Sequence, residues 1–96
     1  MTKFELAANP NTPTEVLIEL SKDENNIVRH YVTANPNTPM HVLIRLCKED
    51  DDFYVVSRIN IDNFPLDILI ELSKHKRPYI AAAAKKIRMN RISLLK

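Results

Sequence analysis

The segment Ala8-Asn9-Pro10-Asn11-Thr12-Pro13 recurs 26 residues later as Ala34-Asn35-Pro36-Asn37-Thr38-Pro39, and Pro65 lies one further period along. The same apolar block follows each of these final prolines. The three blocks are Val16-Leu17-Ile18-Glu19-Leu20, Val42-Leu43-Ile44-Arg45-Leu46 and Ile68-Leu69-Ile70-Glu71-Leu72. A period of this length indicates that the chain is built from tandem structural units.

The Asn-Pro-Asn-Thr-Pro segment has the chemistry of a helix end followed by a helix start. Asparagine can end a helix, proline blocks its continuation, threonine caps the next helix, and proline suits the first helical position. Glu15 stands three residues after Thr12, the spacing of a capping box, which predicts a helix over 13–22. A polar link and a second helix, as over 27–32, complete each unit as a helix pair.

The phase of the repeat predicts the organisation of the whole chain as an all-α single domain over 1–96. In the second repeat, Val55 and Arg58 depart from the pattern and predict a one-residue slip or bulge over 55–60. Asn90 falls at the capping place of Thr12, which predicts a new helix start there. The predicted segments are a partial N-terminal helix over 1–8, repeats over 9–34, 35–60 and 61–86, and a partial C-terminal cap over 87–96.

These units resemble the repeats of the leucine-rich repeat variant family. The resemblance rests on Asn-Pro-Asn-Thr-Pro followed by Val-Leu-x-x-Leu, then Asp23 and Val28-Arg29, and it covers nearly the whole chain. It implies that each α-helix is paired with a short α or 3₁₀ helix, and that the pairs stack in a HEAT-like, right-handed superhelix, a short α-solenoid. Some relatives carry a cysteine-ligated iron–sulfur domain, but one cysteine cannot hold such a cluster.

Composition excludes several classes of function. Glycine is absent, which removes the loops that cradle phosphates in nucleotide sites, and asparagine, at Asn25, Asn26, Asn35 and Asn90, is expected to supply any left-handed residue. The single cysteine, Cys47, cannot form an internal disulfide. No apolar stretch of membrane-spanning length and no leader pattern occurs, so we expect a cytoplasmic protein with no membrane contact.

The sequence predicts no catalytic residue, no cofactor and no metal. The three histidines, His30, His41 and His75, are not spaced to share adjacent helical turns with one another or with Cys47. Cys47 takes the repeat position of two serines on the packing face, which predicts a buried thiol. The acidic run over 49–52 is interpreted as a solvated linker whose carboxylates favour the start of the next helix.

Charge is distributed unevenly along the chain. Residues 1–73 carry six basic and twelve acidic residues, whereas residues 74–96 carry eight basic residues and no acid. Glu19, Arg45 and Glu71 share one repeat position, where opposite charges are expected to complement each other between repeats. Lysines share another position, and this ladder is a candidate surface for an acidic partner; its members are Lys22, Lys48 and Lys74.

Two features of the last third point to binding. The segment 79–84 is apolar all round a helix, which favours self-association through Tyr79, Ala81 and Ala82. The basic tract that follows consists of Lys85, Lys86, Arg88 and Arg91, with Lys85, Arg88 and Arg91 on one helical face and Ala83, Ala84 and Ile87 expected against the core.

Two functions therefore stay open. The first is a non-catalytic module that binds another protein, a second copy of the chain included. The alternative is an accessory protein that binds nucleic acid through the basic tract. An enzyme is a distant third, since no catalytic group has been placed.

Overall fold

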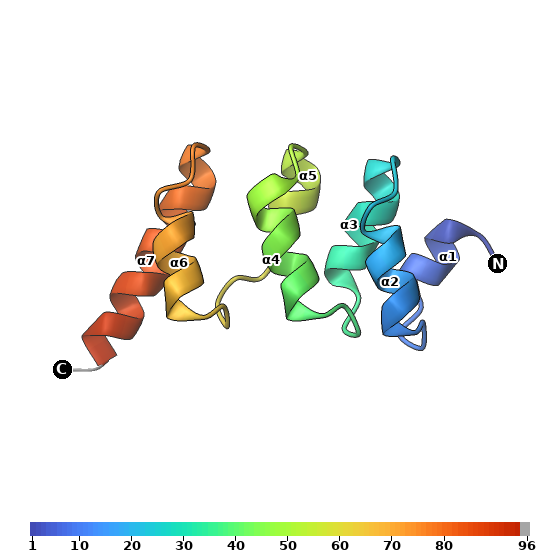
Figure 1. The fold of residues 1–96 in the computed structure, drawn as a ribbon, viewed down its shortest axis with the longest axis horizontal. Helices are drawn as coiled ribbons and strands as arrows, with labels where there is room; N and C mark the ends of the chain where they lie inside the picture. Colours follow the sequence, from blue (N-terminus) through green and yellow to red (C-terminus); the bar gives the residue numbers. More distant parts are fainter. Residues whose placement is uncertain (95–96) are drawn as a thin grey trace. The chain divides into compact units, whose positions relative to one another are not determined.

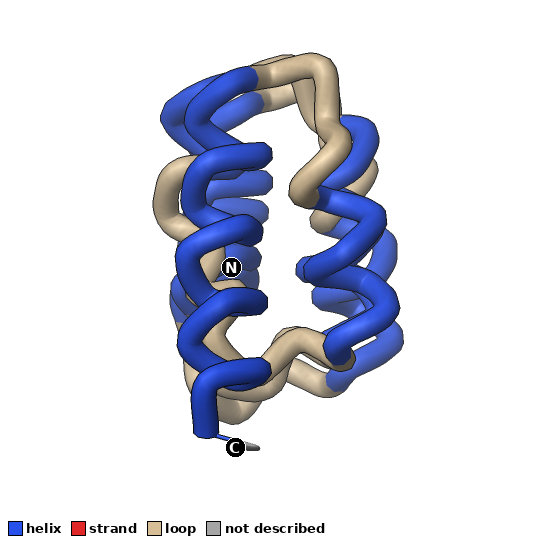
Figure 2. Tube along the Cα trace, turned by 90° about the vertical axis from the view of Figure 1, so that its left-hand side faces the viewer, coloured by secondary structure: helices blue, strands red, loops and turns tan. Residues whose placement is uncertain are grey.

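The computed structural model describes residues 1–94, which form seven helices and, within that range, no strand (Figures 1 and 2). The prediction of an all-helical fold is confirmed. The chain divides into two compact units, residues 1–59 and 60–96. This division falls one residue before the predicted boundary between the second and third sequence repeats.

The first unit contains five helices: α1 (Lys3–Ala8), α2 (Thr14–Leu20), α3 (Asn26–Ala34), α4 (Met40–Glu49) and α5 (Phe53–Val56). Helices α1, α3 and α5, the second helices of successive sequence repeats, lie side by side in this unit (Figure 1). Along the five helices of this unit, the apolar residues at intervals of three and four positions face inward, as the repeated block predicts. The most deeply buried are Ala7, Leu17, Val28, Val32, Val42, Leu46 and Val55.

The asparagine of the repeated motif ends the preceding helix, as predicted. Asn9 and Asn35 are the C-terminal caps of α1 and α3, but both have extended backbone, and no residue of the described chain has a positive φ. The expectation that asparagine supplies left-handed residues is therefore wrong. The following proline makes a left-handed cap unnecessary, because it already blocks continuation of the helix.

The threonine of the motif has a different role from the one predicted. The hydroxyl of Thr12 donates a hydrogen bond to the Leu6 carbonyl at 2.6 Å, back toward α1, and Pro13 takes the N-cap position of α2 without a side-chain cap. The capping box predicted for Glu15 therefore does not form. A capping box is found instead at α1, where Thr2 and Glu5 bond reciprocally.

Side-chain amides join the two copies of the motif across one repeat period. The amide nitrogen of Asn35 is buried and donates to the carbonyls of Ala7 at 2.8 Å and Asn9 at 2.9 Å. The amide of Asn37 does the same for two further carbonyls, those of Pro10 (2.6 Å) and Thr12 (3.3 Å). The asparagine amides thus bond backbone carbonyls at the end of α1 and in the segment that links α1 to α2.

The slip predicted in the second repeat is confirmed. Helix α5 is a single turn, and its buried residues begin at Val55, one position later than the period from Val28 specifies. Tyr54, which holds the repeat position of Val28, is exposed as a consequence.

The second unit contains α6 (Leu66–Leu72) and α7 (Pro78–Leu94), which pack together through Leu69, Leu72, Ile80 and Ala84. Helix α7 passes through Asn90 without a break, so the predicted helix start within the cap over 87–96 is wrong. The physical reason is that Arg88 holds the repeat position of Pro10 and Pro36, so no proline stops the helix there. The last two positions of that cap, 95 and 96, lie outside the described residues.

Candidate functional site

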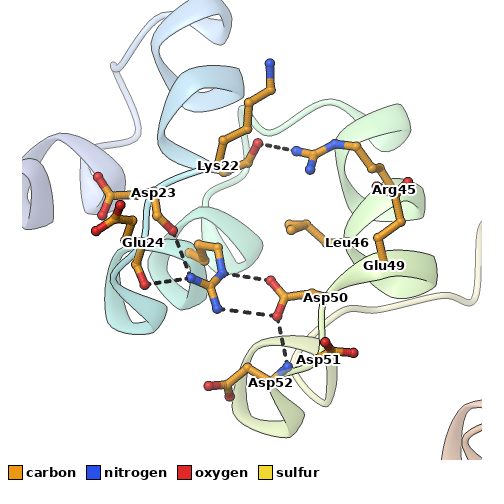
Figure 3. Close-up of a pocket in the computed structure, with 11 residues that line it drawn as sticks. Lys22, Asp23, Glu24, Arg45, Leu46, Glu49, Asp50, Asp51 and Asp52 are labelled. Atoms are coloured by element: carbon orange, nitrogen blue, oxygen red, sulfur yellow. Dashed lines mark hydrogen bonds and ion pairs between the residues drawn. The ribbon is translucent and has the colours of Figure 1, made fainter.

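A cluster of charged side chains joins the loop after α2 to the loop after α4 (Figure 3). Arg29 of α3 lies at its centre: its Nε is 2.8 Å from Oδ2 of Asp50, and its Nη2 is 3.4 Å from Oδ1. Nη1 donates to the backbone carbonyls of Asp23 and Glu24. The side chains of Arg29 and Asp50 are only 17% and 7% exposed, so this ion pair is structural, and Asp50 does not belong to a solvated linker.

The neighbouring Asp52 begins helix α5. Asp52 caps α5 by accepting from the backbone N–H groups of Tyr54 and Val55, which confirms the role predicted for this part of the acidic run. Asn26 donates to Oδ2 of Asp52 at 2.8 Å and thereby lowers the pKa of the carboxyl, with the two backbone hydrogen bonds adding to the effect. Oδ2 of Asp23 lies 2.9 Å from Nζ of Lys3.

An open depression of about 600 Å³ lies between these loops. Its walls are charged, and within residues 1–94 no group of three or more His, Cys, Asp or Glu side chains is arranged to hold a metal ion. Lys22 of the predicted lysine ladder lines the depression (Figure 3). Arg45, which was expected to complement Glu19, donates to the hydroxyl of Ser21. The depression thus lies where polar and charged side chains of the first two sequence repeats meet.

The remaining lysines of the ladder have different surroundings. Lys48 is half-buried near the end of α4, and Lys74 is exposed directly after α6 in the second unit. Lys22 and Lys74 are thus exposed, whereas Lys48 is partly covered.

A second cluster, on α3 and α5, is formed mainly by aromatic rings and is partly exposed to solvent. The ring of His30 stacks on Tyr54 with centroids 4.3 Å apart, and the ring of Tyr31 is tilted against His30 at 5.7 Å. The guanidinium of Arg58 lies 5.6 Å from the Tyr54 ring centre, within range of a cation–π interaction. The exposed fractions are 45% for Ile27, 38% for Tyr31, 62% for Phe53 and 46% for Tyr54.

We call five residues of these two neighbouring helices, three of them joined by the ring contacts, the aromatic surface: Ile27, His30, Tyr31, Phe53 and Tyr54. Reasoning from the sequence missed it. A signal was present, because Ile27 and Phe53 stand 26 residues apart and place a large apolar side chain at the same repeat position. The exposure of Tyr54 follows from the slip in α5 and was not visible in the pattern.

The basic tract of α7 is divided by the structure. Lys85 and Lys86 are exposed, but Arg88 is half-buried, with its Nε shielded from solvent and without a hydrogen-bond acceptor. The guanidinium of Arg91 donates to the backbone carbonyls of Asp62 and Phe64. The prediction that Lys85, Arg88 and Arg91 form one solvent-facing stripe is therefore wrong, because the face that packs toward α6 includes position 91.

Arg91 has a counterpart in the first unit. The carbonyls of Asp62 and Phe64 occupy the repeat positions of Pro10 and Thr12, which accept from Asn37 in the first unit. A guanidinium projecting from α7 thus performs for the third repeat the task that an asparagine amide performs for the first. Arg91 therefore has a structural role in the second unit.

The residues predicted for self-association lie on different sides of α7. Tyr79 and Ala81 are half-buried, and Ala82 and Ala83 are exposed. Ala83 was expected against the core but is exposed, whereas Ile80 and Ala84 are buried. The segment is covered on one side only.

Cys47 is buried in α4, as predicted. Burial raises the pKa of its thiol to about 11, so the reactive thiolate is disfavoured at neutral pH. The prediction of a buried thiol is confirmed.

No helix of the described chain is long and apolar enough to cross a membrane. Comparison with models of known protein families, with curated proteins and with solved structures finds no match.

Proposed function

We propose that this chain is a non-catalytic module that binds another protein through the aromatic surface on α3 and α5. The observation that supports this function most strongly is the exposure of four large apolar side chains, Ile27, Tyr31, Phe53 and Tyr54, on the neighbouring helices α3 and α5. Aromatic residues are enriched in protein interfaces and supply much of their binding energy. The His30–Tyr54 stack and Arg58 hold part of this surface in a fixed conformation, which lowers the entropy cost of binding.

We further propose that the sequence repeats form a short α-solenoid of the leucine-rich repeat variant type. The amide of Asn35 supports this, because it reaches the carbonyl of Asn9 across one full repeat period. The side-by-side arrangement of α1, α3 and α5 within the first unit also agrees with stacked helix pairs. Helix pairs of this kind present one helix from each repeat as a continuous binding surface.

The alternative, nucleic-acid binding through the basic tract, has lost much of its support. Arg91 is held by backbone carbonyls and Arg88 is half-buried, which leaves Lys85 and Lys86 as the exposed cations of the tract. Affinity for phosphate rises with the number of charges neutralised. Two lysines are a weak basis for such binding.

Site-specific photo-crosslinking in the native cell tests the proposed function. A photoreactive phenylalanine derivative at Phe53 is expected to capture a defined protein, and one at Met40 is the matched control because this apolar residue of α4 is also exposed. Capture at Phe53 should weaken when Tyr31 and Tyr54 are replaced by serine. Equal capture at both positions, or capture of nucleic acid at Phe53, would contradict the proposal.

A further inference from the structure

Helix α7 presents a mixed basic and apolar stripe to solvent. One side of the helix packs toward α6, through Ile80 and Ala84 and through the bonds of Arg91. The opposite side is exposed at intervals of three and four residues, at Ala82, Lys85, Met89 and Ile92, with Lys86 beside them. Met89 is 63% and Ile92 is 40% exposed. We call these five residues the α7 stripe.

The aromatic surface of the first unit has an acidic edge. Glu24 is exposed three residues before Ile27, and Asp51 is exposed two residues before Phe53. Carboxylates therefore flank the apolar residues at the first turns of α3 and α5. The first unit, residues 1–59, carries six basic and nine acidic residues, a net charge of −3.

The second unit has the opposite sign. Residues 60–96 carry eight basic and three acidic residues, a net charge of +5. An apolar surface with an acidic edge lies on one unit, and an amphipathic helix with apolar residues beside lysines lies on the other. Docking of a helix by anchors at intervals of three and four residues is a common mode of recognition, and the flexible methionine side chain adapts well to aromatic surfaces.

We propose that the α7 stripe of one copy of the chain docks on the aromatic surface of a second copy. Met89 and Ile92 contact the tyrosine and phenylalanine rings of α3 and α5, and Lys85 and Lys86 face the carboxylates of Glu24 and Asp51. The contact is heterologous, since two different surfaces meet, and repeated contacts of this kind form a ring or an open chain. This inference rests on the proposed function of the aromatic surface and names its partner.

Sedimentation velocity of nuclease-treated protein tests the assembly. At about 50 μM, where a micromolar complex is populated, the parent is expected to sediment as more than a monomer. Raising the salt from about 50 mM to about 500 mM should weaken the association, because screening reduces the attraction between the charged edges. A parent that remains monomeric under both conditions overturns the inference, and the cross-linking at Phe53 then still decides whether the aromatic surface binds a different protein.

Two variants test which surfaces meet. Phe53→Glu alters the aromatic surface alone, and Met89→Glu alters the α7 stripe alone; each should weaken self-association roughly tenfold or more, as expected for an apolar anchor. An equimolar mixture should form a dimer that grows no further, because each variant keeps the surface that the other lacks. Met40→Glu, on α4, is the matched control and should associate like the parent.

The remaining outcomes each overturn the inference. Variants that still associate show that a different surface is used, and variants that do not complement each other show that the contact is not heterologous. Association that disappears on nuclease treatment shows that nucleic acid bridges the copies. Circular dichroism of each variant verifies that the helical fold is retained before its association is compared.

Discussion

At the scale of single residues, polar side chains in the first unit form hydrogen bonds and ion pairs that connect successive sequence repeats. Arg29 joins two loops through Asp50 and two backbone carbonyls, and Asn35 joins two copies of the same motif. The sequence placed Arg29 in the repeat pattern but did not identify Asp50 as its partner. The acidic run offers four neighbouring carboxylates, and only the backbone path of the loop selects one of them.

Replacing Arg29 by methionine should destabilise the first unit. The substitution leaves Asp50 buried without its cation, which is expected to cost about 2–4 kcal/mol in the free energy of unfolding. Urea denaturation followed by circular dichroism measures the loss. The double variant Arg29→Met/Asp50→Leu should recover part of it, because no charge is then left buried; a double variant less stable than Arg29→Met would refute this account.

Acidification should weaken the start of α5. Hydrogen bonds from Asn26 and from two backbone N–H groups lower the pKa of Asp52 below its usual value of 3.8. The unfolded chain therefore binds a proton more readily than the folded chain, so this stabilisation is present above pH 3.8 and is lost as the pH falls through the lowered pKa.

Asp52→Asn tests this dependence because asparagine is also a good N-cap but has no charge to titrate. The variant should be less stable than the parent at about pH 6 and should lose less stability on acidification to about pH 3. Glu15→Gln removes an exposed carboxylate from α2 and serves as the control. Identical acid dependence of the parent and Asp52→Asn would exclude the proposed contribution.

At the scale of helices, the repeat predicted the first helix of each pair well and the second helix poorly. The beginnings of α2, α4 and α6 follow a proline in each case, a local constraint that can be recognised in sequence. The lengths of α5 and α7 depend on whether a stop follows. Ser57 ends α5 after one turn, and α7 continues past Asn90. The missing proline in α7 can be read from the sequence, whereas nothing in the repeat marks the early end of α5.

Arg91 should hold the C-terminal half of α7. Arg91→Ala removes the charged hydrogen bonds to the carbonyls of Asp62 and Phe64, and we expect a loss of about 1–2 kcal/mol in the free energy of unfolding of the second unit. Hydrogen exchange should accelerate at the amides of residues 87–93. The exposed Lys86→Ala is the matched control and should change stability by less than about 0.5 kcal/mol.

Arg91→Lys separates geometry from charge. Lysine keeps the positive charge but lacks the planar fork that reaches two carbonyls together, so it should restore only part of the lost stability. Full recovery by lysine would show that the charge alone is sufficient. No change in exchange for Arg91→Ala would show that the two bonds contribute nothing to α7.

Within α4, burial decides which leucine is costly to remove. The repeat pattern identifies Leu43 as a core position, since Leu17 and Leu69 at the same position are fully buried, but Leu43 is half-buried and Leu46 is 2% exposed. Leu46→Ala should therefore cost about 2–5 kcal/mol, and Leu43→Ala distinctly less. Paired urea titrations compare the two, and a larger loss for Leu43→Ala would contradict the observed burial.

At the scale of the whole molecule, the sequence predicted an all-helical repeat protein and the uneven charge along it. It did not predict the aromatic surface, because the exposure of Tyr54 requires the slip that turns Val55 inward. It also suggested a continuous basic stripe on α7, which the bonds of Arg91 interrupt. Binding surfaces depend on which side of each helix remains uncovered, and the sequence pattern specifies this only where the repeat is regular.

Cys47 offers a measure of how often the native molecule opens. The thiol is 2% exposed and burial raises its pKa to about 11, so a thiol reagent should label it only when the surrounding helices separate. Leu17→Ala leaves a cavity in the same unit and should lower the free energy of opening by about 2–5 kcal/mol. The labelling rate should then rise roughly tenfold for each 1.4 kcal/mol lost, provided that closing is faster than labelling.

Met40→Ala, an exposed substitution on the same helix as Cys47, should label at the parent rate. Rapid labelling of the parent, at the rate seen in urea, would show that the thiol is accessible in the folded chain and would refute its burial in α4.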